Sequence, residues 1–299
     1  MISKEAQAAK NKLQKEVVDP SVSLAEERSG WDEYASTLPL AGDVETSELK
    51  IAGVDCLWLT PKNMIDDKFL IYAHGGGLVV GSITTHRAFV SYLAKAVGRK
   101  ILMVGYGLLP EHDFSKPMAD ITAVYSALVD EKEIEPTQIY FAGDSSGAGA
   151  ALSSLIHLRD LGRNLPNGFI ALSGAFDVSL QGATMETNNE ADPVLSYEVL
   201  KHWQQQYFDG KIDLEHPHIS PLFSNLNNLP DMYLVAGGDE VWLDDSVRLA
   251  KRVNQSGGMA QLKIFEKMWH VFQMDTDLPE SHLVMKQIKT FLDNGAVEG

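Results

Sequence analysis

The sequence has little cysteine, no long apolar run and a shortage of positive charge. Its 299 residues include one cysteine, Cys56, so no disulfide can form within the chain. No apolar stretch approaches the roughly 18 residues that a membrane span requires. Lys and Arg number 25 against 41 Asp and Glu, which gives a net charge of −16. Nucleic acids and anionic membranes bind positive surfaces, so we expect neither as a partner.

The beginning of the chain gives a further exclusion. Residues 1–16 are polar and lack the apolar segment of a secretory signal. A single cysteine is typical of proteins in reducing compartments. Together these features predict a cytoplasmic protein.

Strand and helix patterns alternate along most of the chain. Strand patterns fall at residues 48–51, 54–59, 69–73, 101–104, 138–142, 168–172, 233–236 and 261–265. Helical patterns fall at residues 86–98, 118–132, 146–161, 244–255 and 282–294. Alternation of this kind predicts an α/β fold with a mainly parallel eight-stranded sheet, in which the first two strands run antiparallel.

Two segments depart from the alternation. Residues 1–37 are typical of two amphipathic helices, at 3–18 and 21–37, separated by Asp19 and Pro20. Residues 177–221 are too long for a simple crossover and contain a helical pattern at 193–207. Insertions of this length commonly cover a site. Since no flexible linker is evident, we expect a single domain, residues 1–299, with a helical cap.

The first chemical signal is the sequence GDSSG at residues 143–147. A strand pattern leads into it and a helix rich in Ala and Leu follows. A sharp strand–turn–helix exposes a serine hydroxyl above the sheet, and the first N–H groups of the helix favour negative charge beside it. The alternative is a glycine-rich helix start with Ser145 as a simple N-cap. The context favours Ser145 as a nucleophile.

A second signal is the sequence HGGG at residues 74–77, directly after a strand pattern. Glycines let the backbone approach a substrate and aim N–H groups at it, as an oxyanion hole requires. A dinucleotide loop would need a third glycine at position 80, where Val80 stands, and no P-loop lysine follows. We interpret His74 as structural, because the chain offers a better base.

A serine nucleophile requires a base and an acid, in the chain order Ser, acid, His for this architecture. Asp239 is the first carboxylate after the strand at 233–236, and we predict it as the acid; the competitors are Glu240, Asp244 and Asp245. Asp244 and Asp245 fall at a helix start, where carboxylates serve as caps. His270 follows the last strand and is the predicted base.

The remaining histidines fit a catalytic role less well. His157 and His282 lie inside helical patterns and His86 opens one. His216 and His218, with Glu215, form a loop cluster that we interpret as surface residues, since no further metal ligand stands out. We expect no metal and no organic cofactor.

These residues predict acyl transfer. His270 takes the proton of Ser145 and passes it to the leaving alcohol, while the acid orients His270 and stabilises the imidazolium. Water then hydrolyses the acyl-enzyme. The predicted partner is a small-molecule ester.

The chain resembles the hormone-sensitive lipase family of α/β-hydrolases, the bacterial family IV esterases of the GDSAG type. The resemblance covers nearly the whole chain and rests on HGGG, GDSSG, GDEVWLDDS at 238–246 and WHVFQ at 269–273. It implies a triad of Ser145, Asp239 and His270. It also implies oxyanion donors at the backbone of Gly76, Gly77 and Ser146, and a cap formed by about residues 1–45 and 177–220.

The resemblance further implies short to medium acyl esters as substrates, and similar proteins act on monoterpene lactones. Two departures stand out. The family usually has Tyr-Arg-Leu-Ala-Pro where this chain has Gly107 in place of the arginine. Ser146 stands where alanine is common, and we expect little change there, because the backbone N–H is what acts.

Two rival functions share these signals. The same triad opens amides, so an amidase or peptidase is an alternative. The gibberellin receptors resemble the family but have lost the triad histidine, whereas His270 is present here. Either a monomer or a homodimer is expected, the latter through the edge strand at residues 261–265.

Overall fold

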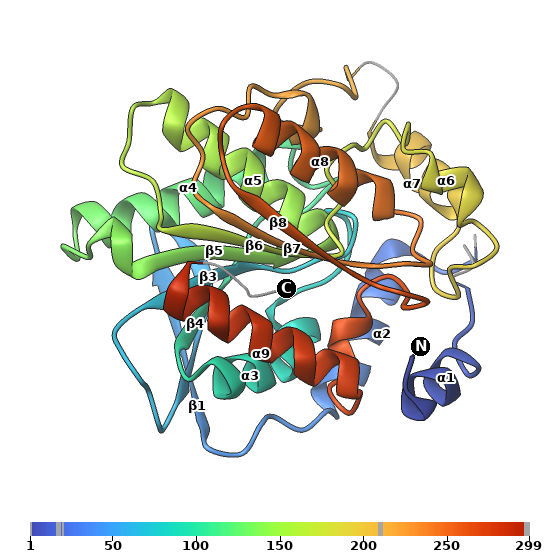
Figure 1. Ribbon diagram of the computed structural model, residues 1–299, viewed down its shortest axis with the longest axis horizontal. Coiled ribbons are helices and arrows are strands. Elements are labelled where there is room, and N and C mark those ends of the chain that lie inside the picture. Colours follow the sequence, from blue (N-terminus) through green and yellow to red (C-terminus); the bar gives the residue numbers. More distant parts are fainter. Residues whose placement is uncertain (1, 16–18, 20, 209–211, 296–299) are drawn as a thin grey trace.

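The computed structural model describes residues 2–15, 19, 21–208 and 212–295, and Figure 1 shows a twisted sheet between layers of helices. The eight strands are ordered β1-β2-β4-β3-β5-β6-β7-β8. Neighbours from β4 to β8 run parallel, while β1 pairs with β2, and β2 with β4, in antiparallel fashion. This is the α/β-hydrolase fold, and the predicted fold class is confirmed.

All eight predicted strands are present with small shifts at their ends. Their bounds are β1 Val44–Ile51, β2 Val54–Pro61, β3 Phe69–Ala73, β4 Lys100–Gly105, β5 Ile139–Asp144, β6 Gly168–Leu172, β7 Met232–Gly237 and β8 Ala260–Phe265. Every residue of β3, β5, β6 and β7 is buried. Parallel strands covered on both faces read as continuous apolar runs, which is why these four were clear in the sequence.

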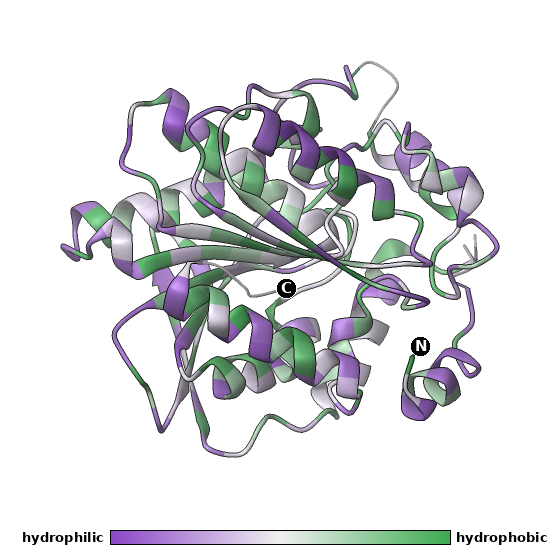
Figure 2. Ribbon diagram, in the orientation of Figure 1, coloured by the Kyte–Doolittle hydropathy of each residue, from purple (hydrophilic) through white to green (hydrophobic). Residues whose placement is uncertain are grey.

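Helices cover both faces of the sheet. In Figure 1, α3 (Ile83–Val97) and α9 (Pro279–Asn294) lie below it, and α4 (Ser115–Asp130), α5 (Ser145–Asp160) and α8 (Leu243–Gln255) lie above it. Figure 2 shows the strands largely apolar and these helices two-sided. Each helix therefore buries one apolar stripe against the sheet.

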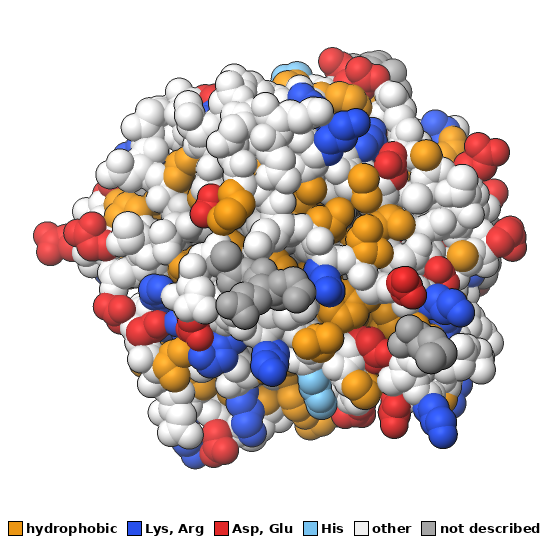
Figure 3. Space-filling view, in the orientation of Figure 1, with side chains coloured by type: hydrophobic (Ala, Val, Ile, Leu, Met, Phe, Trp, Pro, Cys, Tyr) orange, Lys and Arg blue, Asp and Glu red, His pale blue; other side chains and the backbone are white. Residues whose placement is uncertain are grey.

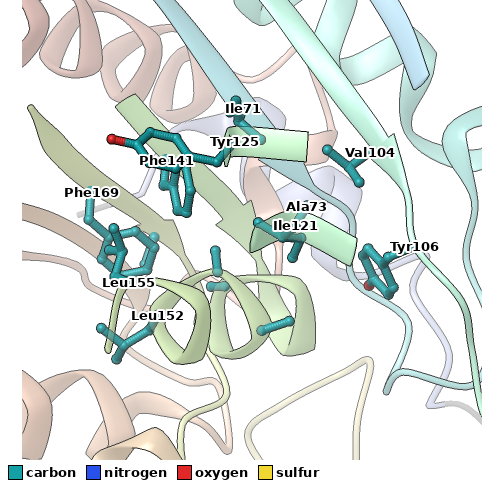
Figure 4. Close-up of a cluster of buried hydrophobic side chains, with 14 of the residues drawn as sticks. Ile71, Ala73, Val104, Tyr106, Ile121, Tyr125, Phe141, Leu152, Leu155 and Phe169 are labelled. Carbon is teal, nitrogen blue, oxygen red and sulfur yellow. The ribbon is translucent and has the colours of Figure 1, made fainter. Parts of the chain in front are cut away.

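The two faces of the sheet carry two separate cores. The core beneath α4 and α5 includes Ile121, Phe141, Leu152 and Phe169, which interdigitate in Figure 4. The opposite core packs α3 and α9 on the other side of the same strands. These cores fix the strand ends at which the chemical signals of the sequence fall.

The N-terminal helices are shorter than the patterns predicted. Helix α1 covers Lys4–Lys10 rather than residues 3–18, and α2 covers Leu24–Ser36. Asn11 caps the end of α1, and part of the predicted helix, residues 16–18, lies outside the described residues. In α2, Ser23 and Glu26 form a capping box that sets its start.

Residues 177–220, called the insertion below, connect β6 to β7 and contain α6 (Thr184–Thr187) and α7 (Tyr197–Tyr207). The predicted helix from 193 begins four residues late because the Ser196 hydroxyl accepts the N–H of Val199 as an N-cap. Figure 1 shows α6 and α7 at the same end of the molecule as α1 and α2.

Acidic and basic side chains are interspersed over the face drawn in Figure 3. Within the described ranges, no helix is long and apolar enough to cross a membrane.

Candidate active site

Ser145 occupies a strained turn between β5 and α5. It is the first residue of α5 and has a φ of 48°, in the left-handed region. Residues other than glycine rarely adopt this backbone conformation. A Cβ on Gly147 would collide with the backbone carbonyls of Ala73 and His74, so only glycine fits against β3 there. The predicted strand–turn–helix around the nucleophile is confirmed.

His270 lies beside Ser145. Its Nε2 is 3.0 Å from the Oγ of Ser145, and its side chain is almost fully buried. The next residue, Val271, has a φ of 50° and donates its N–H to the hydroxyl of Ser173 at 3.1 Å. This turn brings the loop after β8 back over the sheet, as the sequence predicted for His270.

The carboxylate behind His270 belongs to Glu240, and the prediction of Asp239 is wrong in its placement. The Nδ1 of His270 is 3.5 Å from the Oε2 of Glu240, whose side chain is fully buried. The carboxylate of Asp239 instead pairs with Lys10 of α1 and keeps 29% of its side chain exposed. Glu240 was among the competing carboxylates, but the sequence carried no signal that favoured it.

The backbone after β7 explains this choice. The N–H of Gly238 bonds to the carbonyl of Phe265 at 2.8 Å, and that of Asp239 to the carbonyl of Met268 at 2.9 Å. The loop after β7 therefore lies against the loop that leads to His270. With its backbone held there, Asp239 directs its carboxylate towards Lys10 at the surface, and Glu240 directs its own into the interior.

The buried pair alters the protonation of both groups. Burial raises the pKa of Glu240, and the charge of Asp192 adds to this effect. For His270, burial by itself would lower the pKa, but the contact and charge of Glu240, with smaller effects of Asp192 and Asp144, raise it above its ordinary value. A carboxylate in this position favours the imidazolium that forms when His270 accepts a proton.

The glycine loop after β3 borders the same site. Gly76 and Gly77 have φ values of 114° and 64°, which favour glycine. A Cβ on Gly77 would lie 2.8 Å from the ring of Trp203 in α7. The hydroxyl of Ser146 accepts the N–H of Leu78 at 3.1 Å and so links this loop to the nucleophile turn. The sequence did not predict this role for the Ser146 hydroxyl.

A buried network of polar side chains supports the glycine loop after β3. Asp144 accepts hydrogen bonds from the hydroxyl of Tyr72 at 2.7 Å and from the N–H of Gly75 at 3.1 Å, and it lies 3.4 Å from His86. His74 stacks on Tyr106, and burial lowers the pKa of His74 to about 4. His74 is therefore neutral near pH 7, as a structural residue beneath the loop would be.

Ser145 and His270 line a cavity of about 820 Å³. Gly76, Gly77 and Ser146 also line it, so the structure brings together every predicted site residue except Asp239. The remaining lining is largely apolar. From the N-terminal segment it includes Trp31, Tyr34, Ala35 and Leu38, and from the insertion Val178, Leu180, Val194, Leu195, Leu200, Trp203 and Phe208.

Other apolar residues of the N-terminal segment and the insertion do not line the cavity. Met185 is buried in a small cluster with Leu195 and Trp242. Leu24 and Tyr207 pack against the core beneath α4 and α5. Leu13 is 37% exposed, and Val17 lies outside the described residues.

Three histidines outside the site form an aromatic cluster. The rings of His216 and His218 are 5.1 Å apart, and His157 lies 5.8 Å from His218. In the part of the chain that the structure describes, no group of three or more His, Cys, Asp or Glu side chains is arranged to hold a metal ion.

Gly107 stands where the family that this chain resembles has arginine, and neighbouring side chains lie close to it. Its N–H bonds to Asp120 at 2.9 Å, and Asp120 also pairs with Lys116 at 2.6 Å. A Cβ on Gly107 would meet His112 at 2.5 Å. His112 and Lys116 therefore fill the space that a side chain at position 107 would need.

Comparison with known proteins agrees with this geometry. A family described as having the alpha/beta hydrolase fold matches residues 70–274. An esterase of Acinetobacter venetianus is 30% identical over 87% of this chain and 86% of its own length. An acetyl-hydrolase of Streptomyces hygroscopicus is 31% identical over 81% of this chain and 80% of its own length.

Solved structures match over almost the whole chain. A crystal structure of an esterase from the bacterial hormone-sensitive lipase family superimposes with a TM-score of 0.91 at 32% identity, covering 98% of both chains. A structure of EstE5 soaked with p-nitrophenyl butyrate gives a TM-score of 0.90 at 31% identity, covering 97% of this chain and 98% of that one. This chain belongs to the α/β-hydrolase family, in its branch of bacterial hormone-sensitive-lipase-type esterases. It is an enzyme of the serine esterase class.

Proposed function

We propose that the protein hydrolyses carboxylic esters with short to medium acyl chains through a triad of Ser145, His270 and Glu240. The observation that carries the proposal is the chain of contacts from the Oγ of Ser145 through both nitrogens of His270 to the buried Glu240, opening on an apolar cavity. The sequence predicted Asp239 as the acid, and the contact of Glu240 with His270 supports its neighbour Glu240 in that role instead.

The proposed reaction begins with attack of the Ser145 oxygen on the ester carbonyl. His270 accepts the hydroxyl proton at Nε2 and then donates it to the departing alkoxide, so the alcohol leaves and an acyl-enzyme remains. Water attacks the acyl group by the same route in reverse, releasing the acid and restoring Ser145. Glu240 stabilises the imidazolium in both steps and stays ionised.

Charge on the tetrahedral oxygen needs hydrogen-bond donors. We assign this role to the backbone N–H groups of Gly76, Gly77 and Ser146, which border the cavity beside Ser145. Ser146 is the second residue of α5, and N–H groups in the first turn of a helix have no partner within the helix. Donors fixed before the reaction stabilise the oxyanion without reorganisation.

The cavity supports the choice of substrate. Its volume falls within the range of small-molecule sites, about 300–1,000 Å³. Trp31 and Tyr34 of α2 and Trp203 of α7 line it, and we propose that about residues 1–45 and 177–220 act as a cap. Each methylene that fits adds up to about 0.8 kcal/mol of binding, whereas overpacking is unfavourable. A short-chain optimum follows.

The decisive experiment compares p-nitrophenyl butyrate hydrolysis by the wild type and by Ser145→Ala. We expect a kcat about 10⁴-fold lower in the variant with an unchanged circular dichroism spectrum. Activity within tenfold of the wild type would place the nucleophile elsewhere. Matched anilide and lactone substrates in the same assay separate an esterase from an amidase and from a monoterpene lactone-type hydrolase.

The cap has its own test. Deleting residues 1–37 exposes the apolar cavity, and we expect lower activity and a flatter dependence on acyl chain length. An unchanged chain-length profile would contradict the proposed cap.

A cytoplasmic location and a homodimer through the edge strand β8 stay predictions.

A further inference from the structure

The insertion holds a buried carboxylate that the proposed reaction does not use. Asp192 is fully buried. Its Oδ1 accepts the N–H groups of Val194 at 2.9 Å and Leu195 at 3.3 Å, and its Oδ2 accepts the N–H of Val241 at 3.1 Å. Burial of a charge is unfavourable unless hydrogen bonds compensate it. Three N–H donors supply that compensation, and one of them belongs to the residue after Glu240.

Asn188, on the same insertion, contacts the other backbone groups around Glu240. Its Nδ2 donates to the carbonyl oxygen of Gly238 at 3.1 Å and to that of Glu240 at 2.9 Å. Residues 238–241, called the acid loop below, are therefore bound by the insertion on both sides of the acid. Their other side is held by the loop that leads to His270, through the N–H of Asp239.

We propose that Asp192 and Asn188 are positioning residues that hold the acid loop so that Glu240 stays behind His270. The proposal rests on the proposed triad. In its absence the two side chains would only anchor the insertion to the body of the enzyme.

The carboxylate of Glu240 needs such support. Among the described residues, neither of its oxygens has a hydrogen-bond partner of normal geometry, and its approach to His270 is 3.5 Å. The approach to His270 is long and constrains the carboxylate weakly, so the backbone of the acid loop contributes to its orientation. Contacts to the carbonyls of Gly238 and Glu240 and to the N–H of Val241 set the backbone at this point.

The charge of Asp192 has a second consequence. The charges of three carboxylates from different elements act on His270: Glu240 of the acid loop, Asp192 of the insertion and Asp144 at the end of β5. All three raise the pKa of His270, Glu240 most strongly. Asp192 also raises the pKa of Glu240. Removing its charge therefore changes the pH dependence of the reaction, which a purely structural anchor would not do.

The test compares two adjacent asparagines. Asn188→Ala removes both hydrogen bonds to the acid loop. Asn189→Ala is the matched control, because the side chain of Asn189 accepts the N–H of Tyr197 at 2.7 Å and contacts Glu198 at 3.4 Å, both within the insertion. For p-nitrophenyl butyrate we expect kcat to fall about tenfold in Asn188→Ala with KM within about twofold. In Asn189→Ala both constants stay within about twofold.

Asp192→Asn supplies the pH readout. An amide presents one acceptor oxygen and an NH₂ group, so it cannot accept all three N–H groups, and it carries no charge. We expect a lower kcat and a rising limb of kcat/KM that shifts to lower pH than in the wild type and in Asn189→Ala. Active sites are counted by titration with a serine-reactive phosphonate, so misfolded protein does not enter kcat.

Each outcome of these experiments supports or overturns the proposed positioning role. Equal kcat in Asn188→Ala and Asn189→Ala overturns the proposal, and if Asp192→Asn does not fold, this asparagine pair decides alone. A folded Asp192→Asn with an unshifted pH profile also overturns it. If Asn188→Ala is fully active while Glu240→Gln is inactive, the positioning role fails and the triad stands. If Ser145→Ala keeps its activity, the proposed function itself fails.

Discussion

The nucleophile turn at residues 143–147 and the acid loop at residues 238–241 are both short turns at the carboxyl ends of parallel strands, β5 and β7, which β6 separates. The first carries a local sequence signature, with glycines two residues on either side of Ser145 and a helix that follows at once. The second has two adjacent carboxylates and takes its orientation from three other segments, which supply Lys10, Asn188 and Met268. Local chemistry specifies the nucleophile, whereas distant contacts specify the acid.

The largest expected effect separates the two adjacent carboxylates. Glu240→Gln keeps the size of the side chain but removes the charge behind His270 and favours the wrong tautomer. We expect kcat to fall on the order of 10⁴-fold, as for the comparable change in a well-studied triad. Asp239→Asn should stay within about threefold, since its partly exposed pair with Lys10 contributes little. If the two effects are reversed in a steady-state assay with p-nitrophenyl butyrate, Asp239 is the acid after all.

On the nucleophile side, Gly147→Ala should be the most damaging change that leaves every polar group in place. The added methyl meets backbone carbonyls of β3, which cannot rotate away. We expect a loss of about 1–3 kcal/mol in the free energy of unfolding. A displacement of Ser145 should also lower kcat about 10²-fold. Gly42→Ala is the control, because a Cβ there meets no atom within 4 Å and Gly42 does not line the cavity. Urea unfolding and kcat that match this control would show that the turn tolerates a side chain.

The pH dependence tests the link between the two turns, which runs through His270. Neutral His270 is the base, so kcat/KM should rise with pH through one ionisation. Glu240 raises the pKa of His270, so the midpoint should lie above the ordinary histidine value of about 6.5. Activity is lost as the pH falls through this midpoint because His270 becomes protonated. In Glu240→Gln the midpoint should move to lower pH. A midpoint that Glu240→Gln leaves unchanged would contradict the assignment of the acid.

A smaller effect is expected at Ser146. Its hydroxyl accepts the N–H of Leu78 and so joins the nucleophile turn to the glycine loop. Ser146→Ala should reduce kcat by about threefold to tenfold, consistent with one hydrogen bond of about 1 kcal/mol. Ser29→Ala is a suitable control, since that hydroxyl donates to Glu33 of its own helix at 3.2 Å. Wild-type kcat in Ser146→Ala would return the residue to the neutral role that the sequence predicted.

The smallest effect should come from Lys10→Met. It removes the pair with Asp239 and the bond to the carbonyl of Lys267. Partly exposed pairs contribute about 0.2–1 kcal/mol, so the melting temperature should fall by a few degrees at most and kcat should stay within about twofold. A loss of activity comparable to that of Glu240→Gln would mean that α1, and not the insertion, sets the acid loop.

The sequence by itself determined the sheet, the nucleophile turn and the position of His270. Parallel strands that are buried on both faces appear in the sequence as apolar runs. A turn that needs glycine at a fixed position is marked in the sequence by that glycine. It also indicated that the loop with Gly76 and Gly77 lets the backbone approach a substrate closely. These features depend on residues near one another in the chain.

Only the tertiary structure decided which carboxylate lies behind His270. Asp239 and Glu240 differ by one position and have the same charge, so no local pattern distinguishes them. The choice follows from Lys10, more than two hundred residues away in the sequence, which pairs with Asp239 at the surface, and from Asn188 and Asp192, which bind the backbone on either side of Glu240. An acid is selected here by the direction of its side chain, and that direction is a property of the folded loop and its neighbours.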